Sequence, residues 1–312
     1  MKIIPPSYHI LDFLDQQSLA VRIEYCGRIC YKSEDKINQD SAIPFTRKMA
    51  EYGHNSVLEM GALTLKIEGS NRELLAELFA ARPRYLQIDS PDESTLLVSG
   101  SVRAFREMLI FHPECRLVNC MADFLAGRHP YFFDTIIPEK GLQCDPALHI
   151  GKVGLEEVDR LPAPLLAGHR HLAVKFIVNR AITHEIVRHR PCSFLQESQR
   201  YCRYADSKFG NEVTFIKPLF YEEGTREYDL WQKAMEDTER IYLELLETST
   251  PQAARTVLPN SCKTELIVYA NLTEWKHIFK LRTTKAAEPT MREVMIPLHE
   301  EFQHRFPQVF TG

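Results

Sequence analysis

The stretch from residue 180 to residue 204 carries the side chains with the greatest potential for chemistry in this sequence. It holds five arginines and no lysine, and the arginines stand at positions 180, 188, 190, 200 and 203. A guanidinium group presents a planar fork of N–H donors, so arginine is preferred over lysine where a phosphate or a pyrimidine edge is held by two hydrogen bonds. The composition of this stretch therefore indicates an anion-binding site.

The spacing within this stretch brings two segments together. On a helix, residues three and four apart share a face, which places Glu185, Arg188 and His189 side by side. Pro191 stops such a helix. If the chain after it is extended, alternate side chains point the same way, and these belong to Gln196, Ser198 and Arg200. We expect the two segments to converge on one anion.

A plainer explanation exists for each basic residue taken alone. Arginine and histidine at the C-terminus of a helix stabilise its dipole, typically by about 0.3–1 kcal/mol. A solvated helix end would account for Arg188 by itself. Because polar residues continue past the expected helix end, the whole set favours a ligand site.

Three other kinds of chemistry are suggested by single residues in the same region. His184 and His189 are five residues apart and diverge by about 140° on a helix, so no metal site is expected there. Ser198 has no neighbouring base to activate it, so it is expected to bind phosphate rather than to act as a nucleophile. The eight cysteines contain no C-x-x-C pair, and all of them, Cys192 and Cys202 included, are expected to be ordinary reduced thiols.

The totals place the chain among ordinary globular proteins. It has 312 residues and a formal net charge of -4, so no global basic field points to a nucleic-acid partner. No run of about 18 apolar residues occurs, and the N-terminus lacks the apolar stretch of a signal peptide. A cytoplasmic protein without a membrane segment is expected.

The pattern of apolar residues predicts an α+β protein, with mixed helices around an antiparallel sheet. Strands are expected at residues 62–68, 171–178 and 264–271. Helices are expected at residues 15–30, 43–52, 71–82, 102–111, 180–189, 251–259, 274–282 and 289–302. One further amphipathic helix is expected to have an apolar face made of Leu230, Trp231, Ala234, Met235, Ile241, Tyr242, Leu245 and Leu246. The less regular stretch from about 85 to 168 is expected to be an elaboration of the core rather than a separate domain.

In its arginine-rich stretch the sequence resembles the flavin-dependent thymidylate synthases. Their signature is R-H-R, seven residues and then serine, and here Arg188-His189-Arg190 is followed after seven residues by Ser198 and then by Arg200-Tyr201. Four further blocks keep the order of that family, and these are Gly27 to Tyr31, His54 to Glu59, Ala254 to Pro259, and Asn271 with Leu281-Arg282. The resemblance implies a single domain over residues 1–312 with a fold like that of the thymidylate synthase complementing proteins, and an insertion at about 70–168.

The resemblance implies a methyltransferase that converts dUMP to dTMP. Methylenetetrahydrofolate would supply the carbon, FAD would supply the hydride, and NADPH would reduce the flavin again. The protein would be a homotetramer with active sites built between subunits, and it would bind neither nucleic acid nor membranes.

The family's functional positions carry over to residues of this chain. Arg282 would be catalytic by stabilising the ionised uracil ring. The dUMP site would be formed by Glu185, Arg188, Gln196, Ser198, Arg200, Arg255 and Arg282. The FAD site would be formed by Ser56, Arg188, His189, Arg190, Asn271 and His277. His54 and Glu59 are assigned to flavin contact or to buried hydrogen bonding with equal weight.

The chain departs from the family pattern inside the signature. The family has Asn-Glu three and two places before its serine, where this chain has Leu195-Gln196, and an acid follows one place later as Glu197. Glu185 stands where glutamine is common, and an anionic group beside a phosphate is costly unless it pairs with arginine or binds a sugar hydroxyl. Near the flavin, Thr273 replaces a common arginine and Ala286 a histidine.

These departures keep two alternatives open. One is a related flavoenzyme acting on another uridine nucleotide or using another one-carbon donor. The other is a non-catalytic protein that binds nucleotides or RNA through the same arginines, although the net charge of -4 counts against RNA.

Overall fold

A four-stranded antiparallel sheet with the strand order β2-β7-β10-β8 forms the centre of the protein. The computed structural model describes residues 1–139 and 141–311. The strands of this sheet are β2 (Ser7–Ile10), β7 (His171–Asn179), β10 (Lys263–Asn271) and β8 (Ser193–Gln196). Strands β7 and β10 pair over their whole length, from Asn179 opposite Lys263 to His171 opposite Asn271. Because helices cover the sheet, these two strands are apolar at most positions.

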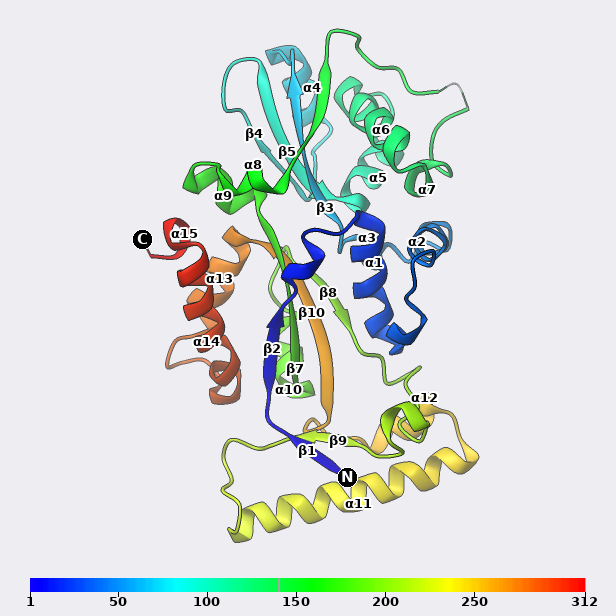
Figure 1. Ribbon diagram of the computed structural model, residues 1–312, viewed down its shortest axis with the longest axis vertical. Coiled ribbons are helices and arrows are strands. Elements are labelled where there is room, and N and C mark those ends of the chain that lie inside the picture. Colours follow the sequence, from blue (N-terminus) through cyan, green and yellow to red (C-terminus); the bar gives the residue numbers. More distant parts are fainter. Residues whose placement is uncertain (140, 312) are drawn as a thin grey trace.

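A second four-stranded antiparallel sheet, with the order β4-β5-β3-β6, lies at the top of Figure 1. Its strands are β4 (Leu86–Asp89), β5 (Thr95–Ser101), β3 (Ala62–Glu68) and β6 (His149–Val153). The helices of this region are α4 (Arg72–Ala80), α5 (Val102–Phe111), α6 (Arg116–Arg128) and α7 (Pro130–Phe133). The expected insertion supplies β4, β5 and β6, which pair around β3 from outside it, and the segment shares core residues with the rest.

Two groups of helices flank the central sheet in Figure 1. One group consists of α1 (Leu19–Arg28), α2 (Ala42–Glu51) and α3 (Asn55–Leu58). The other consists of α8 (Leu155–Asp159), α9 (Ala163–His169), α13 (Leu272–Arg282), α14 (Pro289–Arg305) and α15 (Pro307–Phe310). The second group packs on the sheet through Trp275, Phe279 and Phe302, which are almost completely buried.

The bottom of Figure 1 is formed by the long helix α11 (Arg226–Thr248) with α12 (Pro251–Ala254). Strands β1 (Lys2–Ile4) and β9 (Thr214–Ile216) pair in parallel beside them, and α10 (Arg180–Ile186) leads out of β7. Short 3₁₀ turns stand at Asp12–Leu14, Ile29–Tyr31, Glu34–Lys36, Ser207–Phe209 and Arg255–Val257. No helix of the described residues is long and apolar enough to cross a membrane.

The α+β class is confirmed, and the helix over 102–111 and the strand over 62–68 have the predicted bounds. The prediction of one sheet was wrong, because the stretch from 85 to 168 contributes strands to a second one. Its strands escaped notice because β5 is buried on both faces and so shows no alternation of apolar and polar residues.

Two helix predictions need correction. Helix α10 ends at Ile186 rather than at residue 189, because the last N–H groups bond to carbonyls three residues back and tighten the chain into a turn. In α11 the buried residues are Tyr228, Met235, Tyr242 and Leu246. The helix touches the core along this narrow line only, so Leu230, Ala234, Ile241 and Leu245, which were expected on the buried face, are exposed.

The buried side of the central sheet should dominate stability. Phe176 on β7 has no exposed surface, whereas Phe220 is 63% exposed. We expect Phe176→Ala to lower the free energy of unfolding by about 3–5 kcal/mol, because it removes buried contacts and leaves a cavity. The matched change Phe220→Ala should cost less than about 0.5 kcal/mol. Urea unfolding followed by circular dichroism measures both, and equal losses would contradict this view of the core.

Candidate functional site

A cluster around Arg282 joins the C-terminal end of α13 to that of α10. Arg282 Nη1 donates to Glu185 Oε2 at 2.8 Å, and Arg282 Nη2 donates to the Glu185 carbonyl at 3.4 Å. Arg282 Nε donates to His189 Nε2 at 3.3 Å. Three of the five guanidinium N–H groups are used in this way, so two remain free to donate to a ligand. The negative charge of Glu185, which would be costly beside a phosphate, is balanced by Arg282.

The hydrogen bonds of His189 fix its tautomer. His189 Nδ1 lies 2.8 Å from the Ile186 carbonyl oxygen and must donate to it, so Nε2 carries the lone pair that accepts from Arg282. Burial lowers the pKa of His189, the Ile186 bond opposes this, and the charge of Arg282 lowers it further. His277 lies beside it, with 6.3 Å between ring centroids. The ring is therefore held neutral, and it positions Arg282.

Four arginines that were predicted to bind ligands have uncommitted guanidinium groups. Among the described residues, the side chains of Arg188, Arg190, Arg200 and Arg255 form no hydrogen bond or ion pair with the protein. Arg190 lies over the ring of Phe194 at 5.7 Å, and Arg200 lies over Tyr201 at 5.5 Å. Their N–H donors are thus available to an external anion.

The expectation of an extended run through Ser198 to Arg200 was wrong. Strand β8 ends at Gln196, and the chain turns at Ser198, whose Oγ accepts from the backbone N–H of Arg200 at 3.3 Å. The backbone N–H of Ser198 donates to the Cys30 carbonyl, and this bond ties the turn to the end of α1. Among the described residues, no side-chain base forms a hydrogen bond with the Ser198 hydroxyl, and the binding role of Ser198 stays a prediction.

The two polar residues that depart from the family pattern point inward. Gln196 Nε2 donates to the hydroxyls of Thr183 at 3.0 Å and Thr264 at 3.1 Å, so it joins β8 to α10 and β10. Glu197 is 1% exposed and accepts from Tyr204 at 2.9 Å and from Lys263 at 2.8 Å. The predicted contact of Gln196 with dUMP therefore competes with two structural bonds.

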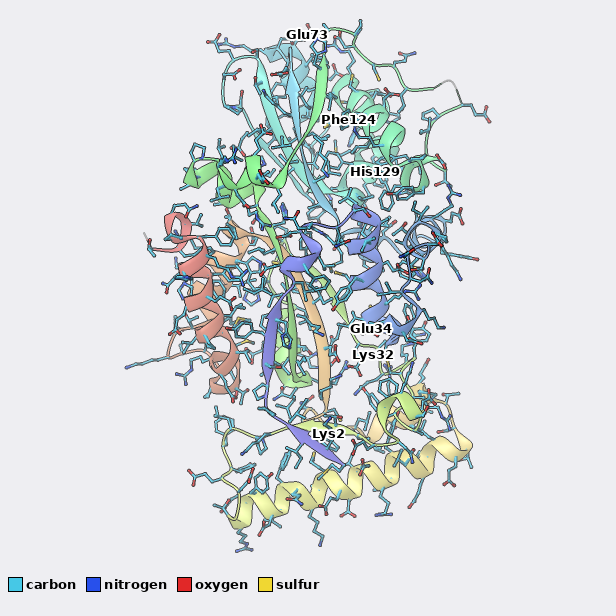
Figure 2. The ribbon with its side chains drawn as sticks, in the orientation of Figure 1. Lys2, Lys32, Glu34, Glu73, Phe124 and His129 are labelled. Carbon is cyan, nitrogen blue, oxygen red and sulfur yellow. The ribbon has the colours of Figure 1, made fainter. Side chains whose placement is uncertain are left out.

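Glu197 belongs to a network of buried charged side chains that continues to the surface. Lys263 also donates to Glu265 at 2.7 Å. Lys32 bridges Glu265 at 3.1 Å and Glu34 at 2.7 Å, and Figure 2 labels Lys32 and Glu34 close to each other. Burial alone would raise the pKa of Glu265, but Lys263 and Lys32 hold it at about 2. The three carboxylates of this network, Glu197, Glu265 and Glu34, all form ion pairs within the protein, and the pairing with Lys263 gives the acid at position 197 a structural role.

A cavity of about 690 Å³ lies between the two sheets. From the central part of the chain it is lined by Arg190, Cys192, Ser193, His171, Tyr269, Asn271 and Glu274, and by Glu59. On the other side, β4 and β5 contribute Gln87, Ser99 and Ser101, α5 contributes Arg103 and Glu107, and Tyr85 lies just before β4. Its size is that of typical small-molecule sites, and its rim mixes aromatic rings with charged groups.

The cavity collects some of the predicted flavin residues and leaves others outside. Arg190 and Asn271 line it. Asn271 also forms two structural hydrogen bonds. Its Oδ1 accepts from the Glu274 N–H at 2.9 Å, and its Nδ2 donates to the Gly168 carbonyl at 3.1 Å. Ser56 is exposed on α3 and is not part of the lining, and Arg188 is exposed past the end of α10.

Sequence reasoning missed the side of the cavity that the upper sheet and α5 supply. Arg103 donates to Glu59 at 2.6 Å and to Glu107 at 2.6 Å, and it thereby binds α5 to the segment after α3. Arg103 and Glu107 are four residues apart on a helix, a spacing that is usually an ordinary surface ion pair. Nothing in the sequence relates this pair to Glu59, 44 residues away.

Thiol chemistry finds no support at the signature. Burial raises the pKa of Cys192 and of Cys202 to about 12, so neither forms a thiolate near neutral pH. All eight cysteines are free. Among the described residues, no group of three or more His, Cys, Asp or Glu side chains could hold a metal ion.

The sequence of this chain matches a known protein family. The family model described as "Thymidylate synthase complementing protein" matches residues 13–90 and 167–308, which together are well over half of the sequence. The chain belongs to this family. The interruption at 91–166 falls inside the predicted insertion, although the match continues past residue 70, where the insertion was expected to begin. The division of the chain into one domain with an insertion stays a prediction.

Individual relatives carry the name flavin-dependent thymidylate synthase. Those of Pyrococcus abyssi and Pyrococcus furiosus are 35% and 36% identical over 153 residues, covering 46% of this chain and 62% of each relative. That of Corynebacterium efficiens is 30% identical over 149 residues, covering 43% of this chain and 57% of the relative. This member of the complementing-protein family thus spans about three fifths of the length of the relatives it matches.

The contact between Arg282 and His189 can be tested by titration. We expect Arg282→Gln to raise the pKa of His189, because the change removes a positive charge that disfavours the imidazolium form. Arg188→Gln is the matched control, since among the described residues the Arg188 side chain forms no hydrogen bond with the ring and is not among the charges that shift its pKa. Histidine ring proton shifts followed by NMR against pH report the pKa, and an unchanged value in Arg282→Gln would refute the arrangement.

Proposed function

We propose that this protein is a thymidylate synthase that methylates dUMP to dTMP, with methylenetetrahydrofolate as the carbon donor and FAD and NADPH as reductants. The observation that carries the proposal is the Arg282 cluster. A permanent cation is held in place by a carboxylate and a neutral imidazole, with two N–H donors left over. Such a group favours the anionic form of a ring that it contacts.

The residues present fit a flavin. The cavity is large enough for a ring system, and Arg190 and Asn271, carried over from the family's flavin positions, both line it. The rings of Tyr85 and Tyr269 offer flat surfaces, and Gln87 and Ser193 offer polar groups for ring edges. A bound reduced flavin supplies a hydride that completes the new methyl group.

Each group near Arg282 has a definite task in this proposal. Arg282 donates two N–H groups to the uracil and stabilises negative charge that develops on it during methylation. Glu185 holds the guanidinium by one oxygen, and its other oxygen accepts from a sugar hydroxyl. His189 stays neutral and fixes the orientation of Arg282, so that no proton competes for the same position.

The phosphate end of the nucleotide would be held by Ser198, Arg200 and Arg255. In Figure 1, α13, which ends at Arg282, lies to the left of the central sheet, whereas α12, which leads into Arg255, lies at the lower right. Among the described residues no hydrogen bond or ion pair joins these two sets. This separation supports the proposal that the halves of the site meet between subunits of a homotetramer.

The activity can be measured directly. We expect the purified protein to show the visible spectrum of a flavin, and to release tritium from carbon-5-labelled dUMP when NADPH and methylenetetrahydrofolate are present. A colourless protein that FAD does not reconstitute would refute the proposal. Turnover of UMP equal to that of dUMP would instead favour a related flavoenzyme for another uridine nucleotide.

The role of Arg282 gives a sharper prediction. Arg282→Lys keeps the positive charge but loses the fork of donors, so we expect kcat to fall by about 10²–10³-fold. Arg72→Lys on α4 is the control and should leave kcat unchanged, since Arg72 is exposed and remote from the site. Tritium release at saturating dUMP measures both, and a kcat near that of the parent in Arg282→Lys would remove Arg282 from the catalytic machinery.

A further inference from the structure

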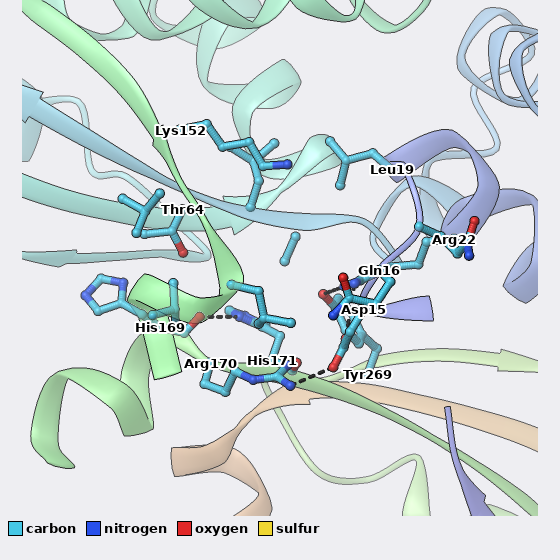
Figure 3. Close-up of a pocket in the computed structure, with 16 residues that line it drawn as sticks. Asp15, Gln16, Leu19, Arg22, Thr64, Lys152, His169, Arg170, His171 and Tyr269 are labelled. Carbon is cyan, nitrogen blue, oxygen red and sulfur yellow. Dashed lines mark hydrogen bonds and ion pairs between the residues drawn. The ribbon is translucent and has the colours of Figure 1, made fainter. Parts of the chain in front are cut away.

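A second, smaller pocket of about 270 Å³ lies where the upper sheet meets the central sheet (Figure 3). The central part of the chain contributes Asp15, Arg22 and Tyr269, together with the segment His169 to His171. The upper sheet contributes Thr64 from β3 and Lys152 and Val153 from β6. Lys152 and Val153 lie in the segment 91–166, outside the family match, whereas the other residues named here lie within it.

The charges of this pocket do not balance. Asp15 accepts from Arg22 at 3.1 Å and from Arg170 at 2.6 Å, so one carboxylate serves two arginines. Arg170 also bonds to Asp159 at 2.8 Å, and Lys152 at the rim forms no ion pair among the described residues. Three cations therefore face two carboxylates, which leaves one positive charge in surplus.

A buried donor in the same pocket lacks a partner. Arg22 is 9% exposed, and it donates from Nη1 to the Tyr269 hydroxyl at 2.7 Å and from Nη2 to the Leu14 carbonyl at 3.0 Å. Its Nε is buried and has no hydrogen-bond partner in the described structure. A buried guanidinium N–H without an acceptor is costly, and an anionic ligand oxygen would satisfy it. Burial, with the charges of Arg22 and Arg170, lowers the pKa of His171 to about 4, so this ring stays neutral and adds no charge.

The small pocket adjoins the larger cavity. Both are lined by Ala62, His171 and Tyr269, and the rings of His171 and Tyr269 are 5.6 Å apart between centroids. The two spaces differ in charge. The larger cavity has Glu59, Glu107 and Glu274 against Arg103 and Arg190, so an anion is favoured only in the small pocket.

We infer that the small pocket binds the anionic tail of a ligand whose ring lies in the larger cavity. The ligand class is a flat heterocycle joined to a carboxylate or a phosphate, as in a folate with its glutamate or a nucleotide cofactor with its phosphate. The choice of folate and a nucleotide cofactor as examples rests on the proposed function. The anion site itself is inferred from the charges of the pocket residues alone. The segment 91–166 then contributes to ligand binding, because Lys152 and β6 form one side of the pocket that holds the tail.

The experiment compares, on the full-length protein, a ligand with a glutamate tail of two carboxylates and a ligand that ends in a single benzoate carboxylate. Folic acid and pteroic acid share the ring system and differ by the glutamate. We expect folic acid to bind at least about tenfold more tightly by calorimetry, because charge-assisted hydrogen bonds are lost with the tail. Lys152→Glu should abolish this preference, while the control Lys233→Glu on α11 should keep it. Thermal unfolding of each variant checks that the fold persists.

If the anionic tail is a phosphate, the expected binding results differ. In that case folic and pteroic acids bind equally, inorganic phosphate competes with NADPH, and Lys152→Glu removes the competition. Equal binding of the two acids together with no effect of phosphate would overturn the inference. Failure of tritium release with an intact preference for folic acid would count against the proposed function and leave the anion pocket standing.

Discussion

The pairing of β7 with β10 is the constraint on which the site depends. The two strands are antiparallel over nine residues each, about 30 Å, and each leads directly into a helix. Helices α10 and α13 therefore start at opposite ends of the strand pair and run back toward each other. Their lengths of seven and eleven residues correspond to about 10 and 16 Å, so their C-terminal ends meet part-way along the sheet. Arg282 reaches Glu185 and His189 for this reason.

Both of these helices begin in the same way, and the similarity fixes their directions. Asn179 accepts from the Ile182 N–H at 3.0 Å, and Asn271 accepts from the Glu274 N–H at 2.9 Å, so each asparagine caps its helix at the last residue of the strand. The caps leave no flexible connection between strand and helix. A small shift in the register of β7 against β10 would therefore move the C-terminal ends of both helices, and the guanidinium of Arg282 would miss its partners. The register of β7 against β10 therefore determines the geometry of the Arg282 cluster.

What the sequence could predict followed from periodicity and from short-range spacing. The strand over 62–68 alternates and the helix over 102–111 has a regular apolar face, so both were found with their bounds. The second sheet was missed because β5 is buried on both faces. The inward direction of Glu197 depends on Lys263, 66 residues away, and no local pattern encodes that contact. The two cavities are likewise made of residues that come together only in the folded chain, and the sequence could offer the arginine-rich stretch but not the surfaces that face it.

A network of buried charged side chains lies beneath the Ser198 end of the signature. Glu197, Lys263, Glu265 and Lys32 anchor the Ser198 turn to β10 and to the end of α1, through bonds that are mostly out of water. Breaking one partner of such a network leaves an unpaired buried charge, which is far more costly than losing a surface pair. The Ser198 turn is thus as firmly fixed as the Arg282 cluster, but to a different part of the sheet. The Ser198 turn and the Arg282 cluster are therefore held to different parts of the central sheet by bonds that do not depend on one another.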